Sequence, residues 1–192
     1  MLFRIILLTT FSIIISDCDI DSSAYINKIN ETLLDFSIDN YIKSEVYFES
    51  CNLIDIGNSL NNKKLLLDSV AAIAFLKMKE DAKKDSIEFI IVSAFRSFDY
   101  QKGIIIRKLN MGRKLKDILK ENTLPGYSEH HTGRAVDFIE KGWYSLSTSF
   151  DKTKEFQWLM ENANKYGFYL SYPEGNKNGI MYEPWHWMYR ND

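Results

Sequence analysis

Apolar residues recur at helical spacing in several stretches of the chain. The strongest pattern, over residues 63–84, predicts a helix because apolar side chains follow at intervals of four, seven and eight positions. The positions expected to face the core are Leu66, Val70, Ile73 and Ala74. Weaker patterns predict a helix over residues 25–36 and a helix over residues 100–120 that is interrupted around residues 110–112.

A last helix is predicted between residues 151 and 167. Asp151 carries a side chain suited to the N-cap, and Gly167 is a natural residue to follow the final turn. The apolar face expected for this helix comprises Phe156, Leu159, Met160 and Ala163.

Runs of β-branched and aromatic residues predict buried strands. The segments with this composition are residues 87–95, 135–139, 168–172 and 180–189. The last two are separated by a turn-rich segment, and strands joined by a short turn pair antiparallel. With helices interspersed among the strands, the pattern predicts an α+β fold in which helices flank a mainly antiparallel sheet.

The N-terminus is almost continuously apolar between positions 5 and 15. This run is shorter than the ~17–25 residues of a membrane-spanning helix and has the length of the apolar part of an export signal. Two other interpretations stay open. One is an uncleaved membrane anchor, and the other is a lipoprotein signal in which Cys18 carries the lipid, although Asp17 departs from the small residue expected before it. All three interpretations direct the chain out of the cytoplasm.

Length and charge limit the architecture and the partners. A chain of 192 residues can hold one domain with a sizeable core plus an appendage. We divide it into a signal (1–18), a linker or wrap rich in Asn, Asp and Ser (19–62) and the domain that carries the chemistry (63–192). The net charge of −2 argues against a nucleic-acid partner, which normally binds a basic patch.

The chain has two cysteines, Cys18 and Cys51, and neither belongs to a Cys-x-x-Cys pair. A zinc site built on thiolates is therefore not expected. In an exported chain the two cysteines could form a disulfide, unless Cys18 carries a lipid.

All three histidines fall in two short segments that also contain carboxylates. His130 and His131 precede Asp137, and His186 follows Glu183. A zinc hydrolase needs three nitrogen or oxygen ligands and an open position, which two histidines and a carboxylate provide. From spacing alone His130 and His131 are equally eligible, and His186 could instead be a core histidine packed between two tryptophans.

A zinc site places demands on the backbone. In a regular strand Glu183 and His186, three positions apart, would point to opposite faces. Pro184 between them cannot donate to a sheet hydrogen bond, so the site predicts irregular backbone from residue 183 to 186. His130 and Asp137 can meet only if the chain turns between them, and Gly133 permits such a turn.

These residues stand in the order of a known family. The chain resembles the VanY-type zinc D-alanyl-D-alanine carboxypeptidases, a group of peptidoglycan peptidases, over about residues 65–189. The matching motifs are Ser93-Ala94-Phe95-Arg96-Ser97 with Gln101, Ser128-x-His130-x-x-Gly133-x-Ala135-x-Asp137, and Tyr182-Glu183-Pro184-Trp185-His186-Trp187.

The resemblance implies a role for each matched residue. His130, Asp137 and His186 would bind one zinc ion at the cleft of the sheet, and Glu183 would be the catalytic base. Arg96 would face the substrate's carbonyl or terminal carboxylate, whereas a surface salt bridge is the alternative for an arginine after a strand. Ser128 and Gln101 are further candidates for substrate contacts. His131 and Met188 depart from the residues frequent in the family, which are glutamine and arginine.

The implied activity is removal of the terminal D-Ala from peptidoglycan stem peptides by an exported, monomeric enzyme of the bacterial cell envelope. A membrane tether through Cys18 agrees with this. Three alternatives differ in substrate or class: a cytoplasmic D-Ala-D-Ala dipeptidase, which the apolar N-terminus disfavours; an L-alanyl-D-glutamate endopeptidase; and a non-catalytic zinc-containing module that binds the cell wall. Glu183 favours an enzyme over a binding module, because a binder needs no base beside its ligands.

Overall fold

The computed structural model describes residues 21–38, 41 and 45–190. The predicted export signal and Cys18 lie outside these residues, whereas Cys51 is not a free thiol. Among the described helices, none is both long and apolar enough to cross a membrane.

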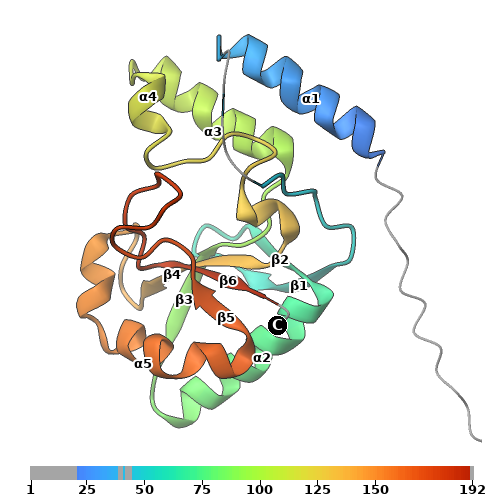
Figure 1. Ribbon diagram of the computed structural model, residues 1–192. Coiled ribbons are helices and arrows are strands. Elements are labelled where there is room, and N and C mark those ends of the chain that lie inside the picture. Colours follow the sequence, from blue (N-terminus) through green and yellow to red (C-terminus); the bar gives the residue numbers. More distant parts are fainter. Residues whose placement is uncertain (1–20, 39–40, 42–44, 191–192) are drawn as a thin grey trace, which may run out of the picture.

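A four-stranded sheet lies at the centre of the molecule (Figure 1). Its strands are ordered β3 (Phe89–Ser93), β4 (Ala135–Glu140), β6 (His186–Tyr189) and β5 (Phe168–Leu170). Every neighbouring pair is antiparallel, which confirms the predicted α+β fold with an antiparallel sheet. The strand predicted over residues 180–189 is regular only in β6.

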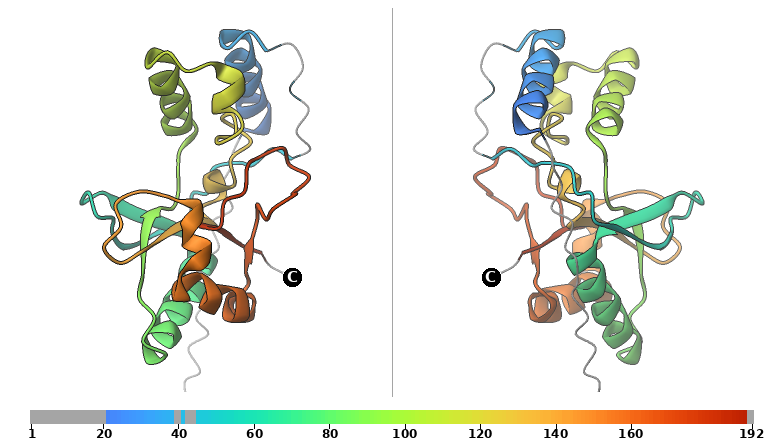
Figure 2. Two further views of the ribbon diagram at one scale, coloured as in Figure 1. Left: turned by 90° about the vertical axis from the view of Figure 1, so that its left-hand side faces the viewer. Right: turned by 90° about the vertical axis from the view of Figure 1, so that its right-hand side faces the viewer.

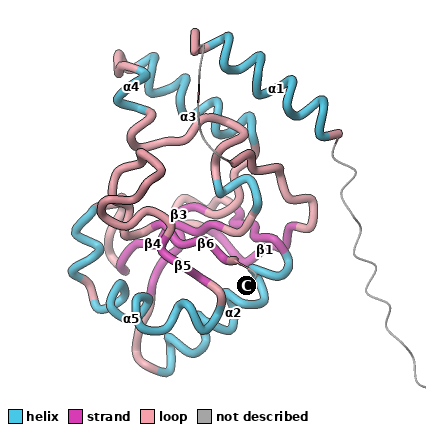
Figure 3. The backbone as a smooth tube through the Cα atoms, viewed as in Figure 1, coloured by secondary structure: helices cyan, strands magenta, loops and turns pink. Residues whose placement is uncertain are grey.

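Helices lie on both sides of this sheet in two separate groups. Figure 2 shows α2 (Ser69–Lys84) and α5 (Lys154–Asn162) below the strands. Above them it shows α1 (Ser22–Asp35), α3 (Phe98–Asn110) and α4 (Leu115–Ile118), and Figure 3 shows the strands between these groups. Val136, Phe138 and Trp187 belong to the main hydrophobic core. Because side chains alternate along a strand, Asp137 and His186 point to the opposite face.

The prediction of a helix over residues 63–84 is wrong for its first part. Residues Lys64–Asp68 form β2, which pairs antiparallel with β1 (Leu53–Asn58), and the helix α2 begins only after Asp68 accepts a hydrogen bond from Val70 N. Its buried residues are Ala71, Ala72, Phe75, Met78 and Ala82, while Ile73 is 68% exposed. Because residues 64–68 belong to the hairpin, the helix begins later and buries a different set of side chains. The hydrogen bonds between β1 and β2 join separate segments, so the spacing of apolar residues within one segment does not reveal them.

The start of the last helix also differs from the prediction. Asp151 lies in the 3₁₀ turn η2 (Thr148–Lys152), and Thr153 caps α5 by accepting from Phe156 N. Met160, predicted to be buried, is 55% exposed. After the 3₁₀ turn η3 (Ala163–Tyr166), Gly167 ends the segment in the left-handed conformation, as predicted.

The interrupted helix is confirmed as α3 (Phe98–Asn110) followed by the short α4 (Leu115–Ile118). Helix α1 (Ser22–Asp35), predicted over residues 25–36, is joined to α3 through the ion pairs Lys28–Asp99 and Lys102–Asp35. Further along, Tyr47 N donates to Gly126 O and Ser50 N to His131 O. The N-terminal segment thus supports the loop that carries the clustered histidines.

Candidate metal centre

Two neighbouring strands and one turn bring three donor side chains together. Asp137 on β4 pairs directly with His186 on β6, and His130 comes from the 3₁₀ turn η1 (Glu129–Thr132). One ligand atom from each residue lies within 4.8 Å of the others, and all three side chains are buried. The structure therefore assembles the trio selected from the sequence.

The predicted irregularities of the backbone are present. Gly133, with φ of 64°, ends η1 in the left-handed region, which lets the chain turn from His130 into β4. At the other segment, His186 N donates to Glu183 O at 3.0 Å, which closes a turn over Pro184 just before β6. The turn brings Glu183 Oε2 to 3.9 Å from His186 Nδ1.

His130 is held in the form that a metal ligand requires. Its Nδ1 lies 2.6 Å from Ala94 O, and because a carbonyl only accepts, this nitrogen carries the proton. Nε2 is consequently an acceptor, and it lies 2.6 Å from Arg96 Nη2 and 3.2 Å from Asp137 Oδ2. Burial and the nearby Arg96 guanidinium lower the pKa of His130 to about 4, so its imidazole is neutral at physiological pH.

Asp137 and His186 form a hydrogen-bonded pair of opposite charge. Burial alone would raise the pKa of Asp137, yet His130, Arg96 and His186 together hold it well below its ordinary value. Burial likewise disfavours the His186 imidazolium, but hydrogen bonds to Asp137 and Glu129 raise the pKa of His186 to about 10. A carboxylate therefore stands at the centre of the trio.

Glu183 has the environment of a general acid–base group. Its side chain is 10% exposed, and burial raises its pKa to about 7, an effect that His186 and Arg96 oppose. A carboxyl group with this pKa can both take up and release a proton near neutral pH.

Arg96 projects into the same cluster and is fixed from several sides. Its Nη2 donates to Asp137 Oδ2 at 2.7 Å and lies 2.6 Å from His130 Nε2, while its Nε donates to Ser93 Oγ. Gln101 Oε1 accepts from Nη1, and the Gln101 amide nitrogen donates to Thr123 O. Both ends of the Gln101 amide are thus bonded within the protein, which suits it to holding Arg96.

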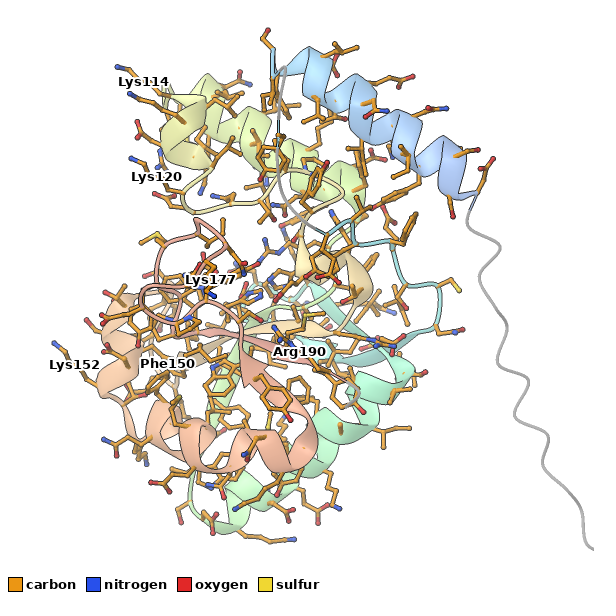
Figure 4. The ribbon with its side chains drawn as sticks, viewed as in Figure 1. Lys114, Lys120, Phe150, Lys152, Lys177 and Arg190 are labelled. Carbon is orange, nitrogen blue, oxygen red and sulfur yellow. The ribbon has the colours of Figure 1, made fainter. Side chains whose placement is uncertain are left out.

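A cavity of about 500 Å³ opens over the trio. Its lining includes the candidate residues Arg96, Gln101, Ser128, His130, Asp137, Glu183 and His186. One wall is helix α3 and another is the loop of residues 171–185, which touches the end of α4 where Met181 N donates to Lys120 O. Figure 4 shows Lys114 and Lys120, which flank α4, extending outward, so these lysines lie at the edge of the molecule.

His131 does not join the trio. Its Nδ1 lies 2.6 Å from Arg96 O, and its Nε2 accepts from Gly126 N at 3.0 Å. Both ring nitrogens are therefore engaged with backbone groups, and burial lowers the pKa of His131 to about 4. The residue links the loop that follows β3 to the loop that precedes η1.

Two residues beside His186 were not predicted from the sequence as part of the site. Glu129, 3% exposed, places Oε2 at 2.9 Å from His186 Nε2, and the Tyr172 ring lies 4.8 Å from the His186 ring between centroids. The only local signal for Glu129 is an acidic residue directly before a histidine. Tyr172 gave no signal.

Comparison with known proteins places this geometry in a family. Residues 64–192 match the family model described as VanY, D-alanyl-D-alanine carboxypeptidase. The putative carboxypeptidase YodJ of Bacillus subtilis (strain 168) is 36% identical over 152 residues, which cover 74% of this chain and 54% of the relative. The D-alanyl-D-alanine carboxypeptidase of Enterococcus faecium is 36% identical over 137 residues, covering 69% and 40%. The chain thus spans about half the length of these curated relatives.

Solved structures share the fold. The LdcB LD-carboxypeptidase superposes with a TM-score of 0.66 at 31% identity, covering 74% of this chain and 69% of that one. VanYB in complex with D-alanine-D-alanine gives 0.58 at 25% identity, covering 79% and 82%. A mutant of the vancomycin resistance D,D-pentapeptidase VanY in complex with Zn(II) gives 0.57 at 25% identity, covering 78% and 83%.

Proposed function

Because this chain belongs to the VanY family of D-alanyl-D-alanine carboxypeptidases, we propose that it is a zinc-dependent peptidase that removes the terminal D-Ala from peptidoglycan stem peptides. The observation that supports this most strongly is the buried trio of His130, Asp137 and His186 with Glu183 beside it. A purely structural site would not need a second carboxyl group, beside that of Asp137, whose pKa lies near neutrality.

The donor set fits zinc. Two imidazoles and one carboxylate are the three-ligand set of a catalytic zinc site, and the site lies against a cavity that leaves room for water and substrate. The lone pairs of His130 Nε2 and Asp137 Oδ2 already receive a cation, the Arg96 guanidinium. The same atoms are therefore arranged to hold positive charge.

When bound, zinc would supply Lewis-acid chemistry, lowering the pKa of a coordinated water from about 15.7 towards 7 and polarising a carbonyl. The chain's own residues account for the proton transfers. Glu183 takes a proton from the attacking water and returns it to the amine of the departing D-Ala, as general base and then general acid. Arg96 donates hydrogen bonds to the carbonyl oxygen as negative charge develops there.

Substrate contacts are assigned from the cavity lining. Ser128, which is buried and lines the cavity, is the candidate donor to the terminal carboxylate of the peptide. Gln101 contributes through the Arg96 guanidinium, whose orientation it fixes. The partner is thus a stem peptide, in accord with the related structure that holds D-alanine-D-alanine.

A second candidate is an L,D-carboxypeptidase, which releases D-Ala from a residue of L configuration. It is favoured by the similarity to LdcB, an LD-carboxypeptidase of 31% identity and a TM-score of 0.66. Both activities use the same zinc chemistry and differ in the residue before the scissile bond. An L-alanyl-D-glutamate endopeptidase, by contrast, would need room for peptide on both sides of the zinc.

Product analysis on two defined peptides tests the proposal. The purified, zinc-loaded protein is incubated with a stem pentapeptide ending in D-Ala-D-Ala and with the tetrapeptide that ends in a single D-Ala. Release of D-Ala from the pentapeptide supports the D,D-activity, and release from the tetrapeptide alone supports the L,D-activity. Cleavage after L-Ala, or no released D-Ala from either peptide, contradicts the carboxypeptidase assignment.

We further propose that the enzyme acts on the outer side of the cytoplasmic membrane as a monomer. The apolar N-terminus and the family's cell-wall substrate support this place of action. Because Cys51 is disulfide-bonded and Cys18 is the other cysteine of the chain, a disulfide between the two, in place of a lipid on Cys18, is the accompanying proposal, and mass analysis of the mature N-terminus in a bacterial host would distinguish them.

A further inference from the structure

Glu129 lies on the side of His186 that faces away from the zinc trio. We propose that it is a positioning residue, which holds the His186 ring so that Nδ1 is presented to the metal. The inference rests on the proposed zinc site and adds to it a residue that touches neither the metal nor the substrate.

The two nitrogens of His186 face two different carboxylates. Nδ1 lies 2.9 Å from Asp137 Oδ1, inside the trio, whereas Nε2 lies 2.9 Å from Glu129 Oε2. Ionised carboxylate oxygens only accept, so the hydrogen bond to Glu129 requires a proton on Nε2. Nδ1, which faces Asp137 inside the trio, is then the nitrogen that would coordinate a metal after it has released its own proton.

Packing holds Glu129 in this position. It is 3% exposed and is the first residue of η1, the turn that also carries His130, so one short segment supplies a ligand and the support for another ligand. Tyr172 lies against the His186 ring, and Arg190 Nη2 approaches Glu129 Oε1 to 3.9 Å from the solvent side. The carboxylate thus has a cation on one side and the imidazole on the other.

The cavities separate Glu129 from the substrate. Glu129 does not line the 500 Å³ cavity over the trio but lines a second cavity of about 840 Å³, together with Arg190. Glu129 thus approaches the zinc trio from behind the His186 ring and not from the cavity over the trio. Its effect on the reaction therefore passes through His186.

Outer carboxylates of this kind fix the ring of a ligating histidine and increase its basicity, and their loss typically weakens metal binding 10- to 100-fold. Glu129→Ala should therefore weaken zinc binding by roughly that factor. Glu129→Gln should stay within roughly fivefold of the wild type, because the amide oxygen can still accept the Nε2 proton.

The test measures zinc affinity of the full chain by competition with a chromophoric chelator. If the alanine variant fails to fold, Glu129→Leu replaces it in the test, because leucine fills a similar volume without a hydrogen-bond acceptor. The same loss of zinc affinity is expected for it. Glu155→Gln is the matched control, because Glu155 is equally buried but lies on α5 and does not line the cavity over the trio. The control should bind zinc as the wild type does.

A second readout separates positioning from a general loss of stability. The rise in unfolding temperature on adding zinc should shrink in Glu129→Ala and recover in Glu129→Gln, whatever the stability of the zinc-free forms. Wild-type zinc affinity in Glu129→Ala or Glu129→Leu would overturn the inference, as would a glutamine variant that binds as weakly as alanine. If the wild type itself binds no zinc, the proposed function fails instead.

Discussion

Asp137 and His186 stand directly opposite each other in the pairing of β4 with β6, and His186 Nδ1 lies 2.9 Å from Asp137 Oδ1. The register of the sheet, and not a flexible loop, therefore sets the distance between these two candidate ligands. Ser93 pairs with Asp137 from the other side, on β3, and binds Arg96 through its hydroxyl.

This arrangement makes the site depend on the pairing of strands distant in sequence. A slip of β6 by one residue would turn His186 into the hydrophobic core and bring Trp187 to the zinc side. The apolar alternation of Val136, Phe138 and Trp187, which are buried in that core, specifies the register against such a slip.

Replacing Glu183 by alanine should slow hydrolysis strongly while the metal stays bound. Loss of a general acid–base group lowers kcat by roughly 100- to 10,000-fold, and the three candidate ligands are untouched. The check is D-Ala release together with zinc content. Glu174→Ala, in the exposed part of the same loop, is the control and should keep wild-type turnover. Unchanged turnover in Glu183→Ala would remove this residue from the mechanism.

The activity should fall on the acid side as Glu183 gains a proton. Burial raises its pKa from 4.5 to about 7, and only the carboxylate can act as the base, so kcat/KM should decline as the pH falls through that pKa. A bound zinc dication favours the carboxylate and moves the pKa downward, which places the acid limb between 4.5 and about 7. A pH–rate profile measures it, and a flat profile down to pH 4.5 would contradict this role.

Replacing Arg96 by lysine should lower kcat by roughly 100-fold, because lysine cannot reproduce the planar fork that donates to several acceptors at once. Zinc content should remain that of the wild type. Arg107→Lys, on α3 but outside the lining of the cavity, is the control and should be fully active. Wild-type kcat in Arg96→Lys would show that a single positive charge suffices there.

His131→Ala should keep zinc yet lose stability. The change leaves the buried Gly126 N–H and Arg96 carbonyl without their partner, a cost of about 2–4 kcal/mol. The folded pKa of about 4 lies below the ordinary 6.5, so His131 contributes stability above 6.5 that is lost as the pH falls through 4. Denaturant unfolding at several pH values measures this, and loss of zinc from a folded variant would make His131 a ligand.

The sequence was most informative where residues of a few segments act together. The resemblance of the motifs around Arg96, His130 and His186 to the family implied the trio and its neighbours. The need for a turn at Gly133 and at Pro184 followed from strand geometry. The structure brings these residues into one cluster, as the sequence led us to expect.

What the sequence did not reveal depends on contacts between distant segments. Glu129 contacts His186, which is 57 positions away, and Gln101 donates to the carbonyl of Thr123. The hairpin of β1 and β2 was missed for the same reason, and with it the true buried face of α2. The spacing of apolar residues predicts the secondary structure of one segment, but it does not predict which other segment packs against it.

The most direct test of the central claim is the rate of D-Ala release from a stem pentapeptide as zinc is removed and restored. The account predicts that a strong chelator abolishes the release, that one equivalent of zinc per chain restores it, and that His186→Ala is not restored by that amount. Undiminished D-Ala release from the protein proven free of metal would contradict the account.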